Sequence, residues 1–370
     1  MERKLGKLRR DPRRFFRDAL DKRASQLADV ATRAALRTPL SRLVRCRRRY
    51  TVVSAVYQVG RYLDDYFASM VGQSVSFEQH IELVLVDDGS TDDSPETIER
   101  WRRRFPANIT YVRKDNGGQA SARNVGLELA TGDWVPFVDP DDFLHLRYFE
   151  QVDRFLTEHE GAPVSLLFCK QVSYYDDTGR YVDDHPLTYR FAHGSHAAPH
   201  GMTADGMLSS ATRGFFPRDV LAREQLRFDE QLRPNFEDGD FTERYVLAVP
   251  DDQVGFVAEA KYFYRKRADG TSTLDLGWSH PGRFGVVVER GYVGLLAAAR
   301  ARLGAVPLSI QRLVLYDVFW LFKRIVDDEA SVAFLDAGQV AAFRSALERV
   351  FASIDVETIL GFDLAGCTEL

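Results

Sequence analysis

Residues 81–90, which read IELVLVDDGS, decide the fold. The first six are almost all apolar and rich in β-branched side chains, which predicts a strand buried on both faces of a parallel sheet. A second stretch of this kind, residues 134–142, reads WVPFVDPDD. In both stretches aspartates begin where the apolar run ends. Because ligands of open parallel sheets bind beyond the carboxyl ends of the strands, these aspartates are the first candidates for a functional site.

Strands and helices alternate around these two stretches. The predicted strands are Thr51–Val56, Ile81–Val86, Ile109–Arg113 and Trp134–Val138, and the predicted helices are Arg61–Gly72, Pro95–Phe105 and Gln119–Ala130. The second helix follows Ser94, a typical N-cap residue, and has proline at its first position. Four strands alternating with helices form a βαβ series. We therefore expect an α/β fold with a Rossmann-like, mostly parallel central sheet flanked by helices.

The second half of the chain is less regular. Its predicted strands are Val164–Tyr175 and Gln253–Arg265, and its predicted helices are Met202–Ser210, Phe241–Ala248, Arg290–Leu303, Ser309–Asp328 and Gly338–Ile354. A tract with irregularly spaced histidines at 185, 193, 196 and 200 is interpreted as a solvated loop rather than a metal site. We expect a basic amphipathic helical segment over 1–49, an α/β domain over 50–279 and a C-terminal helical module over 280–370.

Charge is distributed unevenly along the chain. The formal net charge is -5, yet residues 1–50 hold 17 Lys and Arg against 5 Asp and Glu. Apolar residues at helical spacing between these basic residues suit an interfacial segment on anionic lipid, and equally a pair of surface helices packed on the domain. The first reading implies a protein peripheral to the inner face of the plasma membrane. Three scattered cysteines and no signal peptide or apolar span favour the cytoplasm.

The aspartates that follow the strands predicted over residues 81–86 and 134–138 predict a metal site. Five acids, Asp87, Asp88, Asp139, Asp141 and Asp142, converge on one crevice if both strands end at the same sheet edge. Such carboxylates repel one another unless a cation lies between them. Mg²⁺ or Mn²⁺ held by one or two carboxylates keeps open positions for the oxygens of a substrate diphosphate. The expected cofactor is therefore Mn²⁺ or Mg²⁺.

A glycine-rich loop lies between the two groups of acids. Gly117 and Gly118 precede a predicted helix, and glycines there allow a close backbone approach of phosphate or sugar oxygens to the helix amides. Arg123 follows one turn into this helix and is long enough to reach a phosphate. The alternative is a plain loop whose Arg123 pairs with Asp139 or Asp141.

Several spaced motifs occur in a characteristic order. They are residues 53–57 (VSAVY), residues 86–92 (VDDGSTD), Asn116-Gly117-Gly118 with Ala122-Arg123-Asn124, Gly132-Asp133-Trp134 and Asp139-Pro140-Asp141-Asp142. This order resembles the family 2 glycosyltransferases of GT-A fold, over about residues 50–275. Two positions depart from the family, which usually has Pro at Ala55 and Asn at Gln58.

The resemblance implies roles in donor binding. Asp88 is similar to the acid that contacts the nucleotide base, usually uracil, and Tyr57 lines the same pocket. Arg123 matches an arginine near the nucleotide phosphates, beside the loop of Gly118. Asp141 resembles the direct metal ligand of the Asp-Xaa-Asp motif, and Asp139 supports the metal or the ribose.

The resemblance also implies a catalytic base and a closing segment. Glu237 and Asp238 match the family's Glu-Asp motif, in which the aspartate takes the proton of the acceptor hydroxyl. A simpler reading places these acids at a helix N-terminus, where the helix dipole favours them. Arg265 and Ser272, with Arg267 between them, resemble a strand and loop that fold over the diphosphate.

The resulting expectation is an inverting, metal-dependent hexosyl- or N-acetylhexosaminyltransferase. It moves a sugar from a nucleotide diphosphate donor, most often a UDP-sugar, to a saccharide, a polyol-phosphate polymer or a lipid-linked acceptor, and it is similar to bacterial capsule and cell-wall enzymes. One alternative is a nucleotidyltransferase acting on a sugar phosphate, which needs a basic glycine-rich loop where Ala55–Gln58 stands. The other is a non-catalytic membrane-associated scaffold, although Asp141 and Asp238 are both present. No nucleic-acid partner is expected.

Overall fold

The computed structural model describes residues 44–200, 207–267 and 277–363. The segments 1–49 and 280–370 extend beyond these ranges, so the predicted amphipathic helices before residue 44 and the candidate Ser272 lie outside the described residues. Among the described helices, none combines the length and the apolar character that a membrane span requires.

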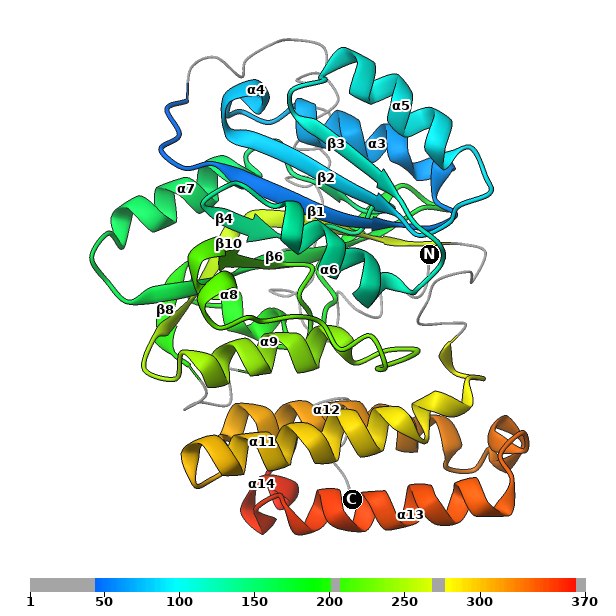
Figure 1. Ribbon diagram of the computed structural model, residues 1–370. Coiled ribbons are helices and arrows are strands. Elements are labelled where there is room, and N and C mark those ends of the chain that lie inside the picture. Colours follow the sequence, from blue (N-terminus) through cyan, green and yellow to red (C-terminus); the bar gives the residue numbers. More distant parts are fainter. Residues whose placement is uncertain (1–43, 201–206, 268–276, 364–370) are drawn as a thin grey trace, which may run out of the picture.

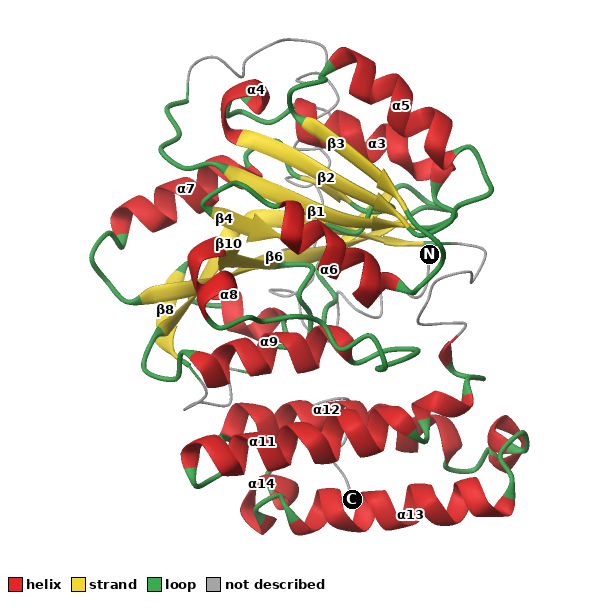
Figure 2. Cartoon of the chain, viewed as in Figure 1, coloured by secondary structure: helices red, strands yellow, loops and turns green. Residues whose placement is uncertain are grey.

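One mixed sheet forms the centre of the molecule (Figures 1 and 2). Its strands are β1 (Tyr50–Val56), β2 (Ile81–Asp87), β3 (Ile109–Arg113), β4 (Trp134–Pro136), β5 (Phe143–Leu144), β6 (Val164–Tyr175), β7 (Arg180–Val182), β8 (His196–Pro199), β9 (Gly214–Pro217) and β10 (Gln253–Lys266). The path through the sheet is β3-β2-β1-β4-β9-β6-β10-β5, with β7 on β6 and β8 on β10.

The first half of this sheet is parallel and the second half is mixed. β1 pairs in parallel with β2 and β4, and β2 with β3. β9 is antiparallel to both β4 and β6, and it thereby joins the two halves. The predicted α/β fold with its GT-A-like sheet is confirmed, and each strand predicted in the first half ends within two residues of its prediction.

Helices cover both faces of the sheet. They are α3 (Gly60–Val71), α4 (Phe77–His80), α5 (Ser94–Arg104), α6 (Gln119–Leu129), α7 (Tyr148–Glu158), α8 (Arg218–Arg223) and α9 (Glu237–Ala248). Alternate residues of β2 explain the two layers. Leu83 and Leu85 belong to the core that contains residues of α3 and α7, whereas Val84 and Val86 belong to the core that contains residues of α6 and α9.

The C-terminal part is helical and shares a core with α9. It consists of η4 (Pro281–Arg283), a π-helical turn η5 (Val287–Val293), α11 (Gly294–Leu303), α12 (Leu308–Ile325), η6 (Glu329–Val332), α13 (Ala337–Ala352) and α14 (Val356–Leu360). In Figure 1, α11 and α12 lie between α9 and α13. Phe236 and Leu247, at the two ends of α9, join the apolar cluster of these helices. The predicted boundary at residue 280 stays a prediction.

Three local predictions need correction, and several short elements were not predicted. α5 begins at Ser94 itself, and the Ser94 hydroxyl accepts a hydrogen bond from the amide of Val59 at 3.2 Å instead of capping its own helix. The predicted helix Met202–Ser210 has no regular element in its described residues, 207–210. The histidine tract is not all loop, because His196–Pro199 forms β8 and His200 is buried. The short elements η2 (Thr188–Phe191), β5, β7 and β9 carry too few residues for a periodic pattern.

Candidate active site

The aspartate after β2 supports the glycine-rich loop. Asp88 is buried, and its carboxylate accepts hydrogen bonds from the amides of Gly117 and Gly118 at 2.8 and 2.6 Å. Lys114 Nζ donates to the same carboxylate at 2.7 Å. Gly118 has a φ of +85°, a conformation that favours glycine. Asp88 therefore fixes the loop that opens α6, and its contact with a nucleotide base stays a prediction.

The turn after β1 presents an aromatic ring to solvent. Tyr57 is 51% exposed. The next residue, Gln58, joins this turn to the loop after β2, because its Oε1 accepts hydrogen bonds from the amides of Thr91 and Asp92 at 3.2 and 3.1 Å. The departure at Gln58 thus fixes the turn after β1 against the loop after β2. An open hollow of about 620 Å³ lies at the ends of β2 and β3, lined by Gly89, Arg113, Lys114, Asp115 and Asn116.

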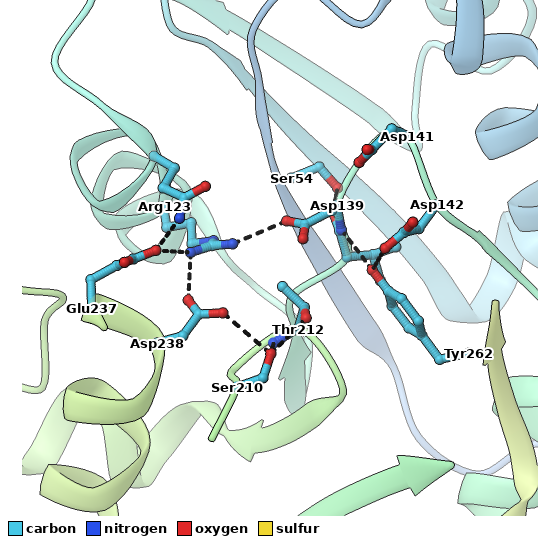
Figure 3. A network of polar contacts seen from close by, with 12 residues as sticks. Ser54, Arg123, Asp139, Asp141, Asp142, Ser210, Thr212, Glu237, Asp238 and Tyr262 are labelled. Carbon is cyan, nitrogen blue, oxygen red and sulfur yellow. Dashed lines mark hydrogen bonds and ion pairs between the residues drawn. The ribbon is translucent and has the colours of Figure 1, made fainter. Parts of the chain in front are cut away.

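Arg123 lies at the centre of the site and contacts three carboxylates (Figure 3). Its guanidinium donates to Asp139 at 3.0 Å, to Asp238 at 2.6 Å and to Glu237 at 3.3 Å. Arg123 is almost completely buried. We call these four residues the acid cluster. They come from α6, the loop after β4 and the start of α9, so residues more than a hundred positions apart meet here. Arg123 forms an ion pair with Asp139, as the alternative interpretation of the sequence expected. Contact between Arg123 and a donor phosphate stays a prediction.

The acid cluster carries excess negative charge. Burial, reinforced by the charge of Asp238, raises the pKa of Glu237 to about 7. Burial also raises the pKa of Asp139 to about 6, although Arg123 opposes this effect. Burial alone acts to lower the pKa of Arg123, but the three carboxylates outweigh it and the pKa is raised. Groups whose pKa lies near neutrality through burial and like charges are typical of functional sites.

The two acids of the Glu-Asp motif have different surroundings. The Glu237 side chain is 3% exposed, and it accepts hydrogen bonds from Gln119 and Arg123. The Asp238 side chain is 19% exposed, and Ser210 Oγ donates to it at 3.3 Å. The Ser210 and Thr212 hydroxyls lie 2.8 Å apart. Only Asp238 is therefore accessible to an acceptor. The sequence did not indicate Ser210 or Thr212, because only the tertiary fold brings them to α9.

The loop after β4 is shaped by a buried carboxylate. Asp142 accepts hydrogen bonds from the Tyr262 hydroxyl and from the Arg265 amide, both at 2.7 Å. The Tyr262 oxygen in turn accepts a hydrogen bond from the Asp139 amide at 3.1 Å. Burial, with the charges of Asp141 and Asp139, raises the pKa of Asp142 well above its ordinary range. Tyr262 thus positions Asp139, a role that a tyrosine in an apolar strand pattern did not reveal.

Two arginines at the end of β10 hold the same loop. Arg267 donates to Asp141 Oδ2 from Nε at 2.9 Å and from Nη2 at 2.6 Å. Arg265 Nε donates to the Asp141 carbonyl at 2.7 Å, and its terminal nitrogens pair with Asp176 and Asp65 at 2.6 and 2.8 Å. Arg265 is buried and its guanidinium is already engaged within the protein, so these contacts favour a supporting role. Its contact with the donor stays a prediction.

Asp139 and Asp141 are the residues that fit a divalent cation. Both side chains are partly exposed on one loop, and carboxylate oxygens are the ligands that Mg²⁺ and Mn²⁺ prefer. Across the described ranges, no group of three or more His, Cys, Asp or Glu side chains is placed to hold a metal. Of the five acids expected in one crevice, Asp87, Asp88 and Asp142 are turned to other partners, which leaves Asp139 and Asp141 as the candidate ligands. Two carboxylates still suit an ion that is shared with a diphosphate.

Known structures share this architecture. The crystal structure of residues 1–349 of TarS from Staphylococcus aureus aligns with a TM-score of 0.61 and 19% identity, covering 84% of this chain and 82% of that one. Together with the parallel β1–β4 series and the Asp-Xaa-Asp loop at its edge, this likeness shows the GT-A fold of glycosyltransferases.

Sequence comparison points to the same class of protein. Residues 51–213 match the family model described as "Glycosyl transferase family 2", so this part of the chain is similar to that family. The minor teichoic acid biosynthesis protein GgaB of Bacillus subtilis (strain 168) is 28% identical over 84% of this chain. GgaA of the same organism is 29% identical over 85% of the chain. The chain spans 33% of the length of GgaB and 69% of that of GgaA.

Proposed function

We propose that this protein is an inverting glycosyltransferase that moves a sugar from a nucleotide diphosphate donor, most often a UDP-sugar, to an acceptor hydroxyl. The observation that carries the proposal is the placement of Asp238. Its partly exposed carboxylate contacts one side of the Arg123 guanidinium, and Asp139 contacts the other side. Asp139 belongs to the loop that also carries Asp141. A proton acceptor and a diphosphate-binding loop thus meet in one cleft, as a direct displacement at the anomeric carbon requires.

The proposed reaction follows from these positions. The acceptor oxygen attacks the anomeric carbon while its proton passes to the Asp238 carboxylate. The bond from that carbon to the diphosphate breaks, and its electron pair stays on the phosphate oxygen. Glu237 is buried behind Asp238, and its like charge and its hydrogen bond to Arg123 set the electrostatics of the base. Ser210 and Thr212 orient the second oxygen of Asp238.

Donor binding is proposed at the ends of the parallel strands. The exposed Tyr57 ring offers a face for the nucleotide base, and the hollow at the ends of β2 and β3 offers room for it. Gly118, held by Asp88, lets the donor approach the start of α6 closely. Arg267 lies on the Asp141 side of the cleft, where the diphosphate is expected.

We also propose that the reaction depends on Mn²⁺ or Mg²⁺ held by Asp141 and Asp139. When bound, such an ion neutralises the charge that develops on the leaving diphosphate. In its absence Arg267 and Arg123 neutralise these two carboxylates. Both arginines are therefore close enough to contact the diphosphate once the carboxylates have another cation.

The acceptor is proposed to be a cell-surface polymer. GgaA and GgaB are named for minor teichoic acid biosynthesis, and a further relative, TarS, is named poly(ribitol-phosphate) beta-N-acetylglucosaminyltransferase. A polyol-phosphate polymer, a saccharide or a lipid-linked precursor at the inner face of the plasma membrane fits these names. The basic segment over 1–49 is the proposed contact with anionic lipid.

Nucleotide binding tests the function. Calorimetry of UDP, GDP, CDP and ADP, each with and without Mn²⁺, should show one nucleotide bound tightly and more tightly with the metal. UDP is the expected nucleotide. Failure of all four to bind would refute the transferase proposal, and equal binding without metal would refute the metal site alone.

A further inference from the structure

A second arginine lies buried near the acid cluster, and none of the carboxylates that the structure describes pairs with it. Arg213 immediately precedes β9 and is 5% exposed. Its Nε is buried without a hydrogen-bond partner, and its side chain makes no ion pair with any residue that the structure describes. The backbone there is firmly held, since the Arg213 carbonyl accepts the amide of Cys169 in β6 at 3.0 Å. The guanidinium is therefore fixed in place but left unneutralised.

The surroundings of Arg213 add positive charge. Burial and the neighbouring Arg190 lower the pKa of Arg213 to about 10, which still leaves it charged at neutral pH. Burial, together with Arg213 and Arg190, lowers the pKa of His185 to about 2 and keeps that ring neutral. Burial raises the pKa of Glu243, an acid near Arg190, to about 8, so it is largely uncharged at neutral pH. We call these four residues the arginine cluster.

A buried guanidinium such as that of Arg213 is costly unless something binds to it. A buried ion without a counter-charge costs several kcal/mol in a protein interior. The other groups that affect the pKa of Arg213 are the hydroxyls of Tyr148, Tyr262 and Tyr316, which are neutral. An anion supplied by a ligand would complete the site, and a planar guanidinium binds phosphate oxygens in a bidentate manner.

The arginine cluster adjoins the Asp238 side of the cleft. Thr212, next to Arg213 in the chain, lies in the hydroxyl pair that orients Asp238. Tyr262, whose hydroxyl is near Arg213, accepts the Asp139 amide. Figure 3 shows Thr212 and Ser210 beside Asp238, with Asp141 at the far side of Asp139. Arg213 is thus linked through Thr212 to the Asp238 side of the acid cluster and through Tyr262 to the loop that carries Asp139.

We propose that Arg213, with Arg190 beside it, forms a subsite for a phosphate group of the acceptor, next to the hydroxyl that Asp238 deprotonates. This inference rests on the proposed function and narrows the acceptor to a phosphate-bearing chain. A phosphate of the donor diphosphate has the same chemistry, so the test has to separate the two sources.

The test is calorimetric titration of inorganic phosphate into the full chain saturated with UDP and Mn²⁺. UDP fills the donor phosphate positions, so phosphate binding that persists reports the acceptor side. Arg213→Met should weaken this binding at least tenfold, while UDP affinity changes less than twofold. Arg227→Met, at an exposed arginine outside both clusters, is the matched control and should bind phosphate as the unaltered chain does.

Three results would overturn the subsite. They are no phosphate binding to the UDP-saturated chain, equal binding by Arg213→Met, and Arg213-dependent binding that UDP abolishes, which would assign the phosphate to the donor. Thermal unfolding provides a second readout, because loss of an unneutralised buried cation should leave Tm equal or higher. A lower Tm for Arg213→Met would indicate a structural arginine instead. If UDP itself fails to bind, the proposed function fails, and phosphate binding by the UDP-free chain still reports Arg213.

Discussion

The acid cluster and the arginine cluster are opposite solutions to buried charge. In the acid cluster one guanidinium contacts three carboxylates at 2.6 to 3.3 Å. In the arginine cluster the Arg213 guanidinium makes no ion pair with any residue that the structure describes, and burial raises the pKa of the acid of this cluster, Glu243, to about 8. The guanidinium of the first cluster is engaged by carboxylates on three sides, whereas Arg213 in the second cluster has no carboxylate partner among the described residues. The difference indicates that the first is built to hold its own geometry, whereas the second is built to receive a charged group.

The largest expected effect is on catalysis at the acid cluster. Asp238→Asn should lower kcat by roughly 10²- to 10⁴-fold, since it removes the proton acceptor. UDP affinity should change little, because Asp238 lies on the acceptor side. Steady-state rates with matched UDP calorimetry measure both. Asp251→Asn, at an exposed acid after α9, is the control and should be neutral. Substantial turnover by Asp238→Asn would exclude it as the base.

The second effect is on stability, and it compares the loss of Arg123 with the loss of Arg213. Arg123→Met leaves three carboxylates without their cation and should lower the free energy of unfolding by about 3 to 5 kcal/mol. Arg213→Met should not lower it. Urea denaturation at pH 7 of the two variants provides the comparison. If both variants lose similar stability, the proposed contrast between the clusters is wrong.

The third effect is on metal-dependent nucleotide binding, and it separates the role of Asp141 from that of Asp238. Asp141→Ala should weaken UDP binding in Mn²⁺ by on the order of 2 kcal/mol, about thirtyfold, and leave the weaker metal-free binding unchanged. The same calorimetry on Asp251→Ala, at an exposed acid after α9, controls for the loss of one carboxylate. Unchanged Mn²⁺-dependent affinity in Asp141→Ala would remove Asp141 from the metal site.

The smallest effect is on pH dependence. Because the pKa of Glu237 is raised from 4.5 to about 7, the folded state binds this proton more tightly than the unfolded state does. The resulting stabilisation is fully present below about pH 4.5 and is lost as the pH rises through about 7. Between pH 5 and 8, the free energy of unfolding of Glu237→Gln should therefore fall by about 2 kcal/mol less than that of the unaltered chain, as measured by denaturation curves. A variant with the same pH profile as the unaltered chain would contradict the raised pKa.

The parallel half of the sheet could be predicted closely from the sequence. Its strands are buried on both faces, so continuous apolar runs such as Ile81–Val86 mark them. Beyond residue 140 the strands are mixed in direction, and β9 joins the halves with only four residues, too few to show any period. Strand order there depends on pairing between distant segments, which a local pattern does not encode.

The candidate site could be predicted from the sequence where its residues lie in motifs. Arg123, Asp139 and Asp238 were identified and do meet in one cleft. Ser210, Tyr262 and Arg213 were not identified, since a serine in an irregular segment or an arginine before a strand carries no local signal. Arg265 was identified only through the resemblance to the family's closing segment. Its ion pairs with Asp65 and Asp176 favour a supporting role, and its contact with the donor stays a prediction.

The shared core of α9 and the C-terminal helices has a genetic consequence. Asp238 lies in the first turn of α9, and Phe236, just before it, packs edge to face on Tyr292 with ring centroids 4.7 Å apart. A loss-of-function screen should therefore recover substitutions in the C-terminal helices around Tyr292, which lies outside the acid cluster. Homologues that differ in this helical region would then differ in activity even with every motif residue intact.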